Sequence, residues 1–181
     1  RRAGHFVIVR VDEHSERMPL TISNADTEKG TITLVVQRIG VSSSRLCALN
    51  VGDELADLVG PLGKATHITN FGTVVCACGG VGAAPMLPIA EALKKAGNRV
   101  ITVLAARTAE LIILREELAK WSDEVIVMTD DGSYGRHGNV TVPLKEMLEA
   151  GEKFDEVITI GPLVMMMLVS LLSRLDVSHI L

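Results

Sequence analysis

The sequence lacks the residue groupings that metal centres and covalent catalysis need. Its three cysteines are odd in number, and none lies in a pair with the spacing of a structural zinc or redox site. Its five histidines are scattered without metal-ligand spacing, and no sequence elbow surrounds a serine or cysteine nucleophile. These absences argue against a metal site within the chain and against a catalytic triad. Unpaired cysteines suit a reducing cytoplasm.

Long apolar runs and charge of one sign are lacking as well. The longest apolar run, Leu163 to Val169, is far shorter than the roughly 18 residues that span a bilayer. The net charge is −4 with acidic and basic residues interspersed, so no field is present that would hold a nucleic acid or an anionic membrane. Apolar residues make up 48% of the 181 positions, which is enough to bury a core. We therefore expect a soluble cytoplasmic protein that binds small ligands.

The pattern of predicted secondary structure changes near residues 66–72, which divides the chain into two parts. Residues 1–70 contain short β-branched runs separated by turn clusters, which indicate an antiparallel β-barrel or sandwich. In residues 71–181 strands alternate with helices, which indicates an α/β domain with a parallel sheet covered on both faces. The expected strands are 5–11, 18–23, 31–37 and 54–59, then 73–77, 100–106, 124–128 and 156–160; the expected helices are 84–96, 112–121, 142–150 and 163–175.

A glycine-rich string follows the first strand of the second domain and opens its first helix. It runs from Cys78 to Pro85 as CGGVGAAP. Glycines let a backbone approach a pyrophosphate, and N–H groups at the start of a helix bind its charge. Pro85 suits a first helical turn, although it stands where the dinucleotide fingerprint GxGxxG has its last glycine. The string predicts a dinucleotide site, and a tight turn without a ligand is the alternative.

Polar residues and a glycine follow the later strands of the same domain. Arg107 ends the second strand, and Asp130 and Asp131 follow the third. Carboxyl ends of parallel strands hold ligands in open α/β sheets, so Arg107 would meet an adenosine ribose or its phosphate, and one aspartate the ribose hydroxyls. The aspartates equally suit an ordinary turn. Gly161 and Pro162 end the last strand, and the three methionines that follow are expected to be mostly core filler.

The first domain carries two candidate sites for a larger cofactor. Arg17 precedes a strand in which Pro19 and Thr21 should share one face, so Arg17 would reach a phosphate and Thr21 a flavin edge. A loop from Gly40 to Ser44 offers a glycine, hydroxyls and a helix start, which suit a diphosphate; a serine helix cap is the alternative. The string GPLG at 60–63 is most simply a turn.

Taken in order, the strings RMPLTIS, GPLG, CGGVGAAP, AAR, TDDGSYGRHG and IGP resemble the ferredoxin–NADP reductase superfamily over almost the whole chain. Within it they look most like the small subunit of NADH-dependent reduced ferredoxin:NADP⁺ oxidoreductase (sulfide dehydrogenase) and the electron-transfer subunit of dihydroorotate dehydrogenase B. The resemblance implies a ferredoxin reductase-like fold. In that fold a six-stranded FAD-binding β-barrel, its first strand before Arg1, is followed by a domain that binds NADH or NADPH.

The resemblance also implies roles for individual residues. It puts FAD beside Arg17, Pro19, Leu20 and Thr21, with backbone contacts from Val36 and Gln37 and the diphosphate at Gly40, Ser42 and Ser43. It surrounds the nicotinamide dinucleotide with Gly80, Val81, Gly82, Arg107, Asp130, Asp131, Gly161 and Pro162. Ile160 stands where many superfamily reductases have a cysteine, which favours the electron-transfer branch.

The resembled subunits bind a 2Fe–2S cluster through four cysteines in a C-terminal segment. Nothing like that segment lies within this chain, so a cluster is expected only if such a segment follows Leu181. We predict an electron-transfer flavoprotein subunit that passes hydride from NAD(P)H to FAD, and single electrons through that cluster to a catalytic or second flavoprotein subunit, with ferredoxin as a further partner. Two alternatives stay open: a stand-alone NADPH-dependent flavin or ferredoxin reductase, and a regulatory nucleotide-binding module without turnover.

Overall fold

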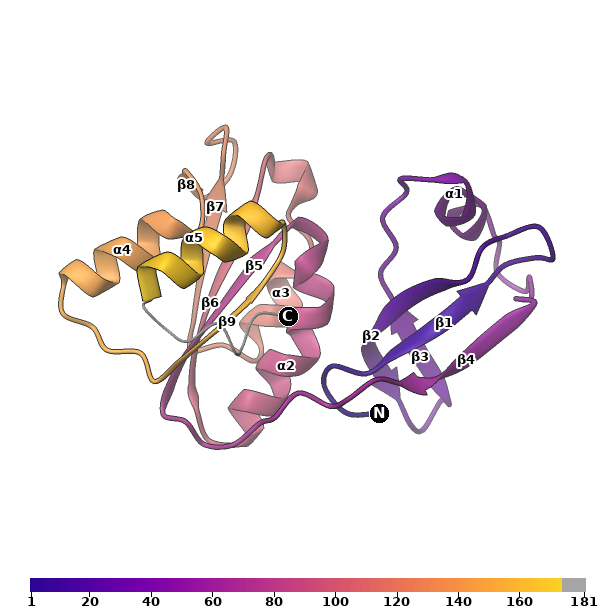
Figure 1. The fold of residues 1–181 in the computed structure, drawn as a ribbon, viewed down its shortest axis with the longest axis horizontal. Helices are drawn as coiled ribbons and strands as arrows, with labels where there is room; N and C mark the ends of the chain where they lie inside the picture. Colours follow the sequence, from indigo (N-terminus) through magenta and orange to yellow (C-terminus); the bar gives the residue numbers. More distant parts are fainter. Residues whose placement is uncertain (174–181) are drawn as a thin grey trace. The chain divides into compact units, whose positions relative to one another are not determined.

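The structure is a computed structural model that describes residues 1–173. The chain divides into two compact units, Arg1–Thr66 and His67–Leu181, which we call the N-terminal and C-terminal units (Figure 1). The expected domain boundary lay between residues 70 and 71. Positions 174 and 175 of the last expected helix, and His179, lie outside the described residues.

The N-terminal unit is built on an antiparallel sheet, as the short β-branched runs predicted. Its elements are β1 (Phe6–Arg10), β2 (Met18–Asp26), β3 (Thr31–Leu34), α1 (Val41–Cys47) and β4 (Asp57–Leu62). The four strands lie in the order β3-β2-β1-β4. Val7, Val9 and Ile22 are buried at the centre of this unit, and Leu46 of α1 packs against them. Alternation along the strands sends every second side chain to the opposite face.

The string GPLG at 60–63 is not a turn, because Gly60 to Leu62 lie within β4. A Cβ on Gly60 would lie 2.6 Å from Cγ1 of Val7, so only glycine lets β4 pass this close to β1. The pairing of β1 with β4 also shifts register between Phe6 and Ile8, as it does at a β-bulge. The expected strand at 54–59 thus starts later and continues through Leu62, because the close approach at Gly60 depends on a residue of another strand, which the local sequence does not indicate.

The C-terminal unit alternates strands and helices, as predicted. Its strands are β5 (Thr73–Gly79), β6 (Arg99–Ala106), β7 (Glu124–Thr129), β8 (Arg136–His137) and β9 (Glu156–Ile160). Its helices are η1 (Gly80–Gly82), α2 (Ala83–Lys95), η2 (Ala109–Leu111), α3 (Arg115–Ala119), α4 (Thr141–Glu149) and α5 (Leu163–Ser173). The strands form a parallel sheet in the order β8-β7-β6-β5-β9, in which the two-residue strand β8 was not expected.

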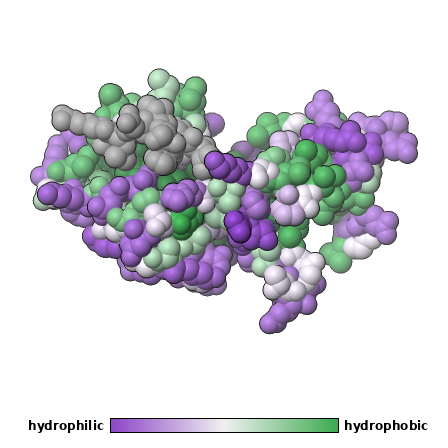
Figure 2. Space-filling model, turned by 60° about the horizontal axis from the view of Figure 1, so that its bottom comes forward, coloured by the Kyte–Doolittle hydropathy of each residue, from purple (hydrophilic) through white to green (hydrophobic). Residues whose placement is uncertain are grey.

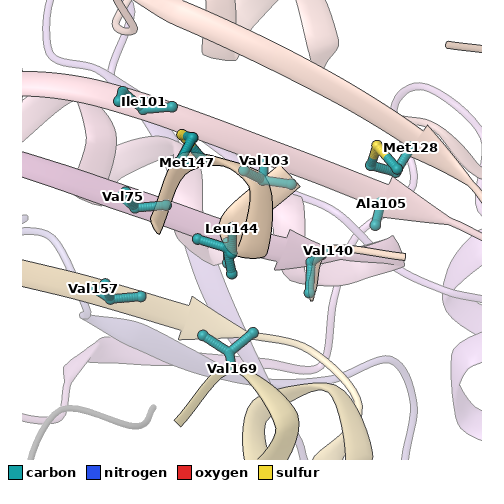
Figure 3. Packing of buried hydrophobic residues seen from close by; sticks show 11 residues of the cluster. Val75, Ile101, Val103, Ala105, Met128, Val140, Leu144, Met147, Val157 and Val169 are labelled. Atoms are coloured by element: carbon teal, nitrogen blue, oxygen red, sulfur yellow. The ribbon is translucent and has the colours of Figure 1, made fainter. Parts of the chain in front are cut away.

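Both faces of the parallel sheet are covered. On one face, α4 and α5 pack on side chains from four neighbouring strands, and Figure 3 shows Leu144 and Met147 of α4 and Val169 of α5 over that cluster. The strand members of the cluster are Val75, Ala77, Ile101, Val103, Ala105, Met128 and Val157. Helices α2 and α3 contact the strands from the other side. Burial on both faces explains why β5 and β6 read as nearly continuous apolar runs.

The strand order creates a switch point beside β5. The chain steps from β5 to β6 and β7 on one side, and later returns to pair β9 with the other side of β5. Open α/β sheets bind their ligands at such a point, outside the carboxyl ends of the strands. The glycine string follows β5 and the string IGP ends β9, so both lie at this switch point.

The prediction of a helix at 112–121 is wrong at its start. The segment begins as η2, passes through extended backbone at Ile112, and becomes α3 only at Arg115. Leu114, immediately before α3, adopts a left-handed φ of +57°, which no helix interior accepts. The β-branched pair Ile112 and Ile113 favours extended backbone, and this overrides the apolar spacing that suggested a helix. None of the described helices is long and apolar enough to cross a membrane.

Candidate nucleotide-binding sites

The turn after β5 leaves room above its backbone. Gly80 has a φ of +55°, and apart from its chain neighbours and its own helical turn no heavy atom of the described residues lies within 4 Å of the place where its Cβ would be. Glycine adopts this left-handed conformation without strain. Helix α2 starts three residues later with no side chain capping its first turn among the described residues. The helical turn Gly80–Gly82 runs directly into α2, and the Ala83 N–H donates to the Gly80 and Val81 carbonyls. The first N–H groups of the Gly80–Gly82 turn have no acceptor within that turn, so the turn is suited to bind an anion.

The turn after β9 packs directly against the turn after β5. A Cβ on Gly82 would lie 2.4 Å from the carbonyl oxygen of Ile160, and one on Gly161 would lie 3.2 Å from the backbone nitrogen of Gly79. Cys78 and Ile160 are paired in the sheet, so the two strands end side by side. The structure thus brings together the predicted residues Gly80, Val81, Gly82, Gly161 and Pro162.

The loops after β6 and β7 also lie side by side. The Asp130 N–H donates to the Ala106 carbonyl at 3.0 Å, and the Asp131 N–H donates to the Arg107 carbonyl at 3.2 Å. Asp131 accepts bonds from the Ser133 hydroxyl at 2.6 Å and its N–H at 3.0 Å. The Ser133 hydroxyl, followed by its N–H, holds the pKa of Asp131 below its usual range. Asp131 therefore stabilises the turn, whereas the exposed Asp130 carboxylate accepts no such bond among the described residues and stays a predicted ligand of a ribose.

Three residues that shape the loop after β7 were missed at the sequence level. The buried Thr129 hydroxyl donates to the Tyr134 carbonyl at 2.8 Å and accepts its N–H at 3.1 Å. The Ser133 hydroxyl also accepts the Ala109 N–H at 2.8 Å, which ties this loop to the loop after β6. The repeated glycines of GSYGRHG were the available signal, because Gly135 cannot carry a Cβ within 2.3 Å of the Val127 carbonyl oxygen.

In the N-terminal unit, an apolar row crosses three strands on the face opposite the core. Ile8 of β1 pairs with Pro19 of β2 and with Val59 of β4, and side chains of directly paired residues share a face. Val59 is 51% exposed, and exposed hydrophobic residues are visible on this unit in Figure 2. Thr21 leaves β2 on the same side as Pro19, as alternation predicts. Leu20 instead packs against the buried core.

Arg17 lies two residues before Pro19, immediately before β2, and its side chain is largely exposed. Its guanidinium is 3.4 Å from a carboxylate oxygen of Asp57, which Arg10 approaches more closely, at 2.6 Å. An exposed ion pair of this length contributes little to stability. Since Arg10 already neutralises Asp57, Arg17 is available for a phosphate.

The loop after β3 holds the predicted helix start, but glycine, not serine, is its N-cap. Gly40 precedes α1, and the Ser43 hydroxyl accepts its N–H at 2.9 Å. The Ser42 hydroxyl accepts the Glu16 N–H at 3.1 Å. Both hydroxyls therefore serve the fold, and the free donors at this helix start are backbone N–H groups. Val36 and Gln37 lie between β3 and α1, outside the strand expected to contain them.

Two buried hydroxyls of the N-terminal unit have no hydrogen-bond partner among the described residues. They belong to Ser23, which is 1% exposed, and to Thr66. Ser23 follows Thr21 by two residues along β2. A buried hydroxyl without a partner costs about 1–3 kcal/mol. Because the surrounding chain covers both oxygen atoms, these hydroxyls belong to the interior of the unit.

The cysteines differ sharply in their surroundings. Cys76 and Cys78 are fully buried in β5, and Cys47 is exposed at the end of α1. Burial raises the pKa of the Cys76 thiol to about 12 and also raises the pKa of Cys78. Neither buried thiol therefore forms the reactive thiolate at neutral pH.

We expect a thiol reagent such as Ellman's reagent, at about pH 8, to modify Cys47 alone in the folded protein, because only the thiolate reacts. All three cysteines should react after unfolding in guanidinium. Absorbance of the released product counts the thiols. Cys47→Ser should be inert when folded, and a second fast-reacting thiol in that variant would contradict the assignment.

Comparison with known proteins gives a family match and close relatives. The oxidoreductase NAD-binding domain family matches residues 77–170. The dihydroorotate dehydrogenase B (NAD(+)) electron transfer subunit homolog of Thermotoga maritima is 42% identical over 173 residues, which cover 96% of this chain and 61% of the relative. The corresponding electron transfer subunit of Streptococcus pneumoniae is 35% identical over 165 residues, 88% of this chain and 64% of the relative.

Among solved structures, a chain of the NADH-dependent reduced ferredoxin-NADP oxidoreductase, described for flavin-based electron bifurcation, superposes with a TM-score of 0.88. It is 40% identical, and the match covers 96% of this chain and 62% of that one. The ferredoxin reductase-like fold expected from the sequence is confirmed. This chain spans less than two thirds of the length of each of these relatives.

Proposed function

Because the chain belongs to the oxidoreductase NAD-binding domain family, we propose that it is the electron-transfer part of an NADH-dependent flavoprotein. In this proposal NADH binds the C-terminal unit, FAD binds the N-terminal unit, and electrons pass on to a partner subunit. The observation that carries it is the pair of abutting glycine turns at the switch point of the parallel sheet, within the matched residues 77–170.

In the C-terminal unit, the loops that follow β5, β6, β7 and β9 would together bind a dinucleotide. The turn Gly80–Gly82 would bind the pyrophosphate through its first N–H groups, since the left-handed Gly80 leaves open space where a Cβ would be. Arg107 and Asp130 would hold the adenosine ribose or its phosphate. Gly161 and Pro162, at the other side of the switch point, would border the nicotinamide.

In the N-terminal unit, the apolar row would contact the flavin ring, and polar groups beside it would bind the rest of FAD. The row of Pro19, Ile8 and Val59 offers an apolar face for a planar ring, and Thr21 borders it. Arg17 and the backbone N–H groups at the start of α1 would hold phosphate oxygens.

FAD, when bound, would supply the exchange between two-electron hydride chemistry and single-electron transfer. The residues of this chain would bind the two cofactors and orient them. No side-chain acid or base is assigned, because hydride transfer between two cofactors moves no proton to the protein. The described residues contain no group of three or more His, Cys, Asp or Glu side chains that could hold a metal. We therefore derive no step through an iron–sulfur cluster within them.

A partner subunit is part of the proposal. The relatives from Thermotoga maritima and Streptococcus pneumoniae are described as an electron transfer subunit homolog and an electron transfer subunit, and such a subunit passes electrons to another protein. We propose a catalytic or second flavoprotein subunit as that partner, with ferredoxin as a further one.

Anaerobic titration of the FAD-loaded protein with NADH tests the function. We expect the flavin absorbance near about 450 nm to bleach with one equivalent of NADH, because a hydride reduces one flavin. Arg17→Ala should lower FAD occupancy, whereas Lys29→Ala, an exposed cation of the same unit, should leave it unchanged. Bound FAD that NADH does not bleach would overturn the proposal, and a protein that takes up no FAD would favour a regulatory module.

A further inference from the structure

Met165, in the first turn of α5, lies against both glycine turns. Its Sδ is 2.8 Å from the place a Cβ on Gly79 would occupy, and its Cε is 2.6 Å from the place of a Cβ on Gly161. Real Cβ atoms do not come this close to other heavy atoms. The thioether thus fills the space that side chains at these two positions would need.

The side chain of Met165 also contacts the hydrophobic core. Met165 packs against the buried cluster formed by the sheet, α4 and Val169 of α5. Its helix is fixed at its start by the bond from the Met166 N–H to the Pro162 carbonyl, at 3.1 Å. The stem of Met165 is therefore held by the core, while its tip reaches the two turns.

Few side chains could take this place. Methionine is unbranched and its thioether adapts to irregular gaps, so it can reach two backbones at once. A leucine at position 165 would branch at Cγ and end at its Cδ atoms, one atom short of the Cε of methionine. Pro162 adds a second contact, because its Cδ is 3.1 Å from the place of a Cβ on Gly79.

We propose that Met165 is a positioning residue whose tip fills the space beside Gly79 and Gly161 and so holds the Gly161–Pro162 turn in the orientation that receives the nicotinamide half of the dinucleotide. This proposal rests on the proposed function. It assigns Met165 a role beyond the core filling that three consecutive methionines suggest. Loss of its tip leaves unfilled space beside Gly79 and Gly161, so the Gly161–Pro162 turn can shift into that space. This shift alters the nicotinamide end and leaves the adenosine end, at Arg107 and Asp130, in place.

Calorimetric titration of the full chain with NAD⁺ and, separately, with AMP tests this assignment. We expect Met165→Ala to weaken NAD⁺ binding about tenfold and to change AMP binding less than about twofold. Met165→Leu should weaken NAD⁺ binding by a smaller factor, and it decides the matter if the alanine variant does not fold. Met167→Leu is the matched control, because Met167 is 61% exposed on the same helix, and it should bind both ligands as the wild type does.

A double variant separates positioning from general packing. Gly161→Ala should weaken NAD⁺ binding, since its new Cβ meets the Met165 tip, and adding Met165→Ala should restore part of that loss. Equal weakening of NAD⁺ and AMP in Met165→Ala, unchanged NAD⁺ binding in it, or strictly additive losses in the double variant would each overturn the inference. A wild-type chain that binds neither NAD⁺ nor AMP would overturn the dinucleotide site itself.

Discussion

Replacing Gly82 with alanine is expected to abolish NAD⁺ binding and to lower the free energy of unfolding by about 2–3 kcal/mol. The new Cβ would lie 2.4 Å from the carbonyl oxygen of Ile160 and 3.0 Å from its carbonyl carbon. Both are backbone atoms at the end of β9, which is paired along its length with β5. They cannot yield without opening the sheet, so the turn must move, and the first N–H groups of α2 move with it.

Gly80→Ala is the matched comparison within the same turn. Its Cβ would meet no heavy atom of the described residues within 4 Å apart from its chain neighbours and its own helical turn, so its cost comes from the left-handed φ of +55°. That conformation costs an alanine about 1–2 kcal/mol. Urea unfolding followed by circular dichroism measures both stabilities, and calorimetry with NAD⁺ measures binding. Equal losses in the two variants would show that close packing on β9 is not what requires glycine at position 82.

The sequence allowed the alternation of strands and helices after residue 73 to be predicted because that signal is local. β5 and β6 carry apolar runs, and a glycine string marks the passage from β5 to α2. The parallel sheet then follows from the rule that such units cover both of its faces. The residues at the carboxyl ends of the strands could be chosen for the same reason, since topology brings those ends to one edge.

The features that were missed depend on contacts between distant segments. Nothing near Gly60 indicates that β4 passes close to Val7, and nothing near Met165 indicates that its tip reaches Gly79. The aspartate pair was left undecided because the choice depends on Ser133, whose hydroxyl is positioned by the loop after β6. In each case the nearby sequence shows which residue is present, but the role of that residue depends on a contact with a distant part of the chain.

Asn98 is the clearest residue of this kind, and removing its side chain should destabilise the protein strongly. Its side chain is 2% exposed and uses all of its hydrogen-bonding capacity. The carbonyl oxygen accepts the N–H groups of Phe71 and Gly72 at 2.7 and 3.1 Å. The amide nitrogen donates to the carbonyls of Thr69 and Leu93 at 2.8 and 2.9 Å. One side chain thus ties the segment before β5 to the end of α2.

We expect Asn98→Ala to lower the free energy of unfolding by about 3 kcal/mol, because it leaves several partly buried backbone groups without partners at about 1 kcal/mol or more each. Urea unfolding measures the loss. Asn139→Ala is the control: Asn139 is exposed, and among the described residues its side chain accepts bonds only from the N–H and hydroxyl of Thr141, at 2.9 and 2.5 Å, so loss of that side chain should cost about 1 kcal/mol. Asn98→Asp keeps both acceptor bonds but turns a carboxylate towards two carbonyls, so it should also be destabilised. If Asn98→Ala cost no more than Asn139→Ala, water would be replacing the amide, and the bonds to Phe71 and Gly72 would not hold this segment in place.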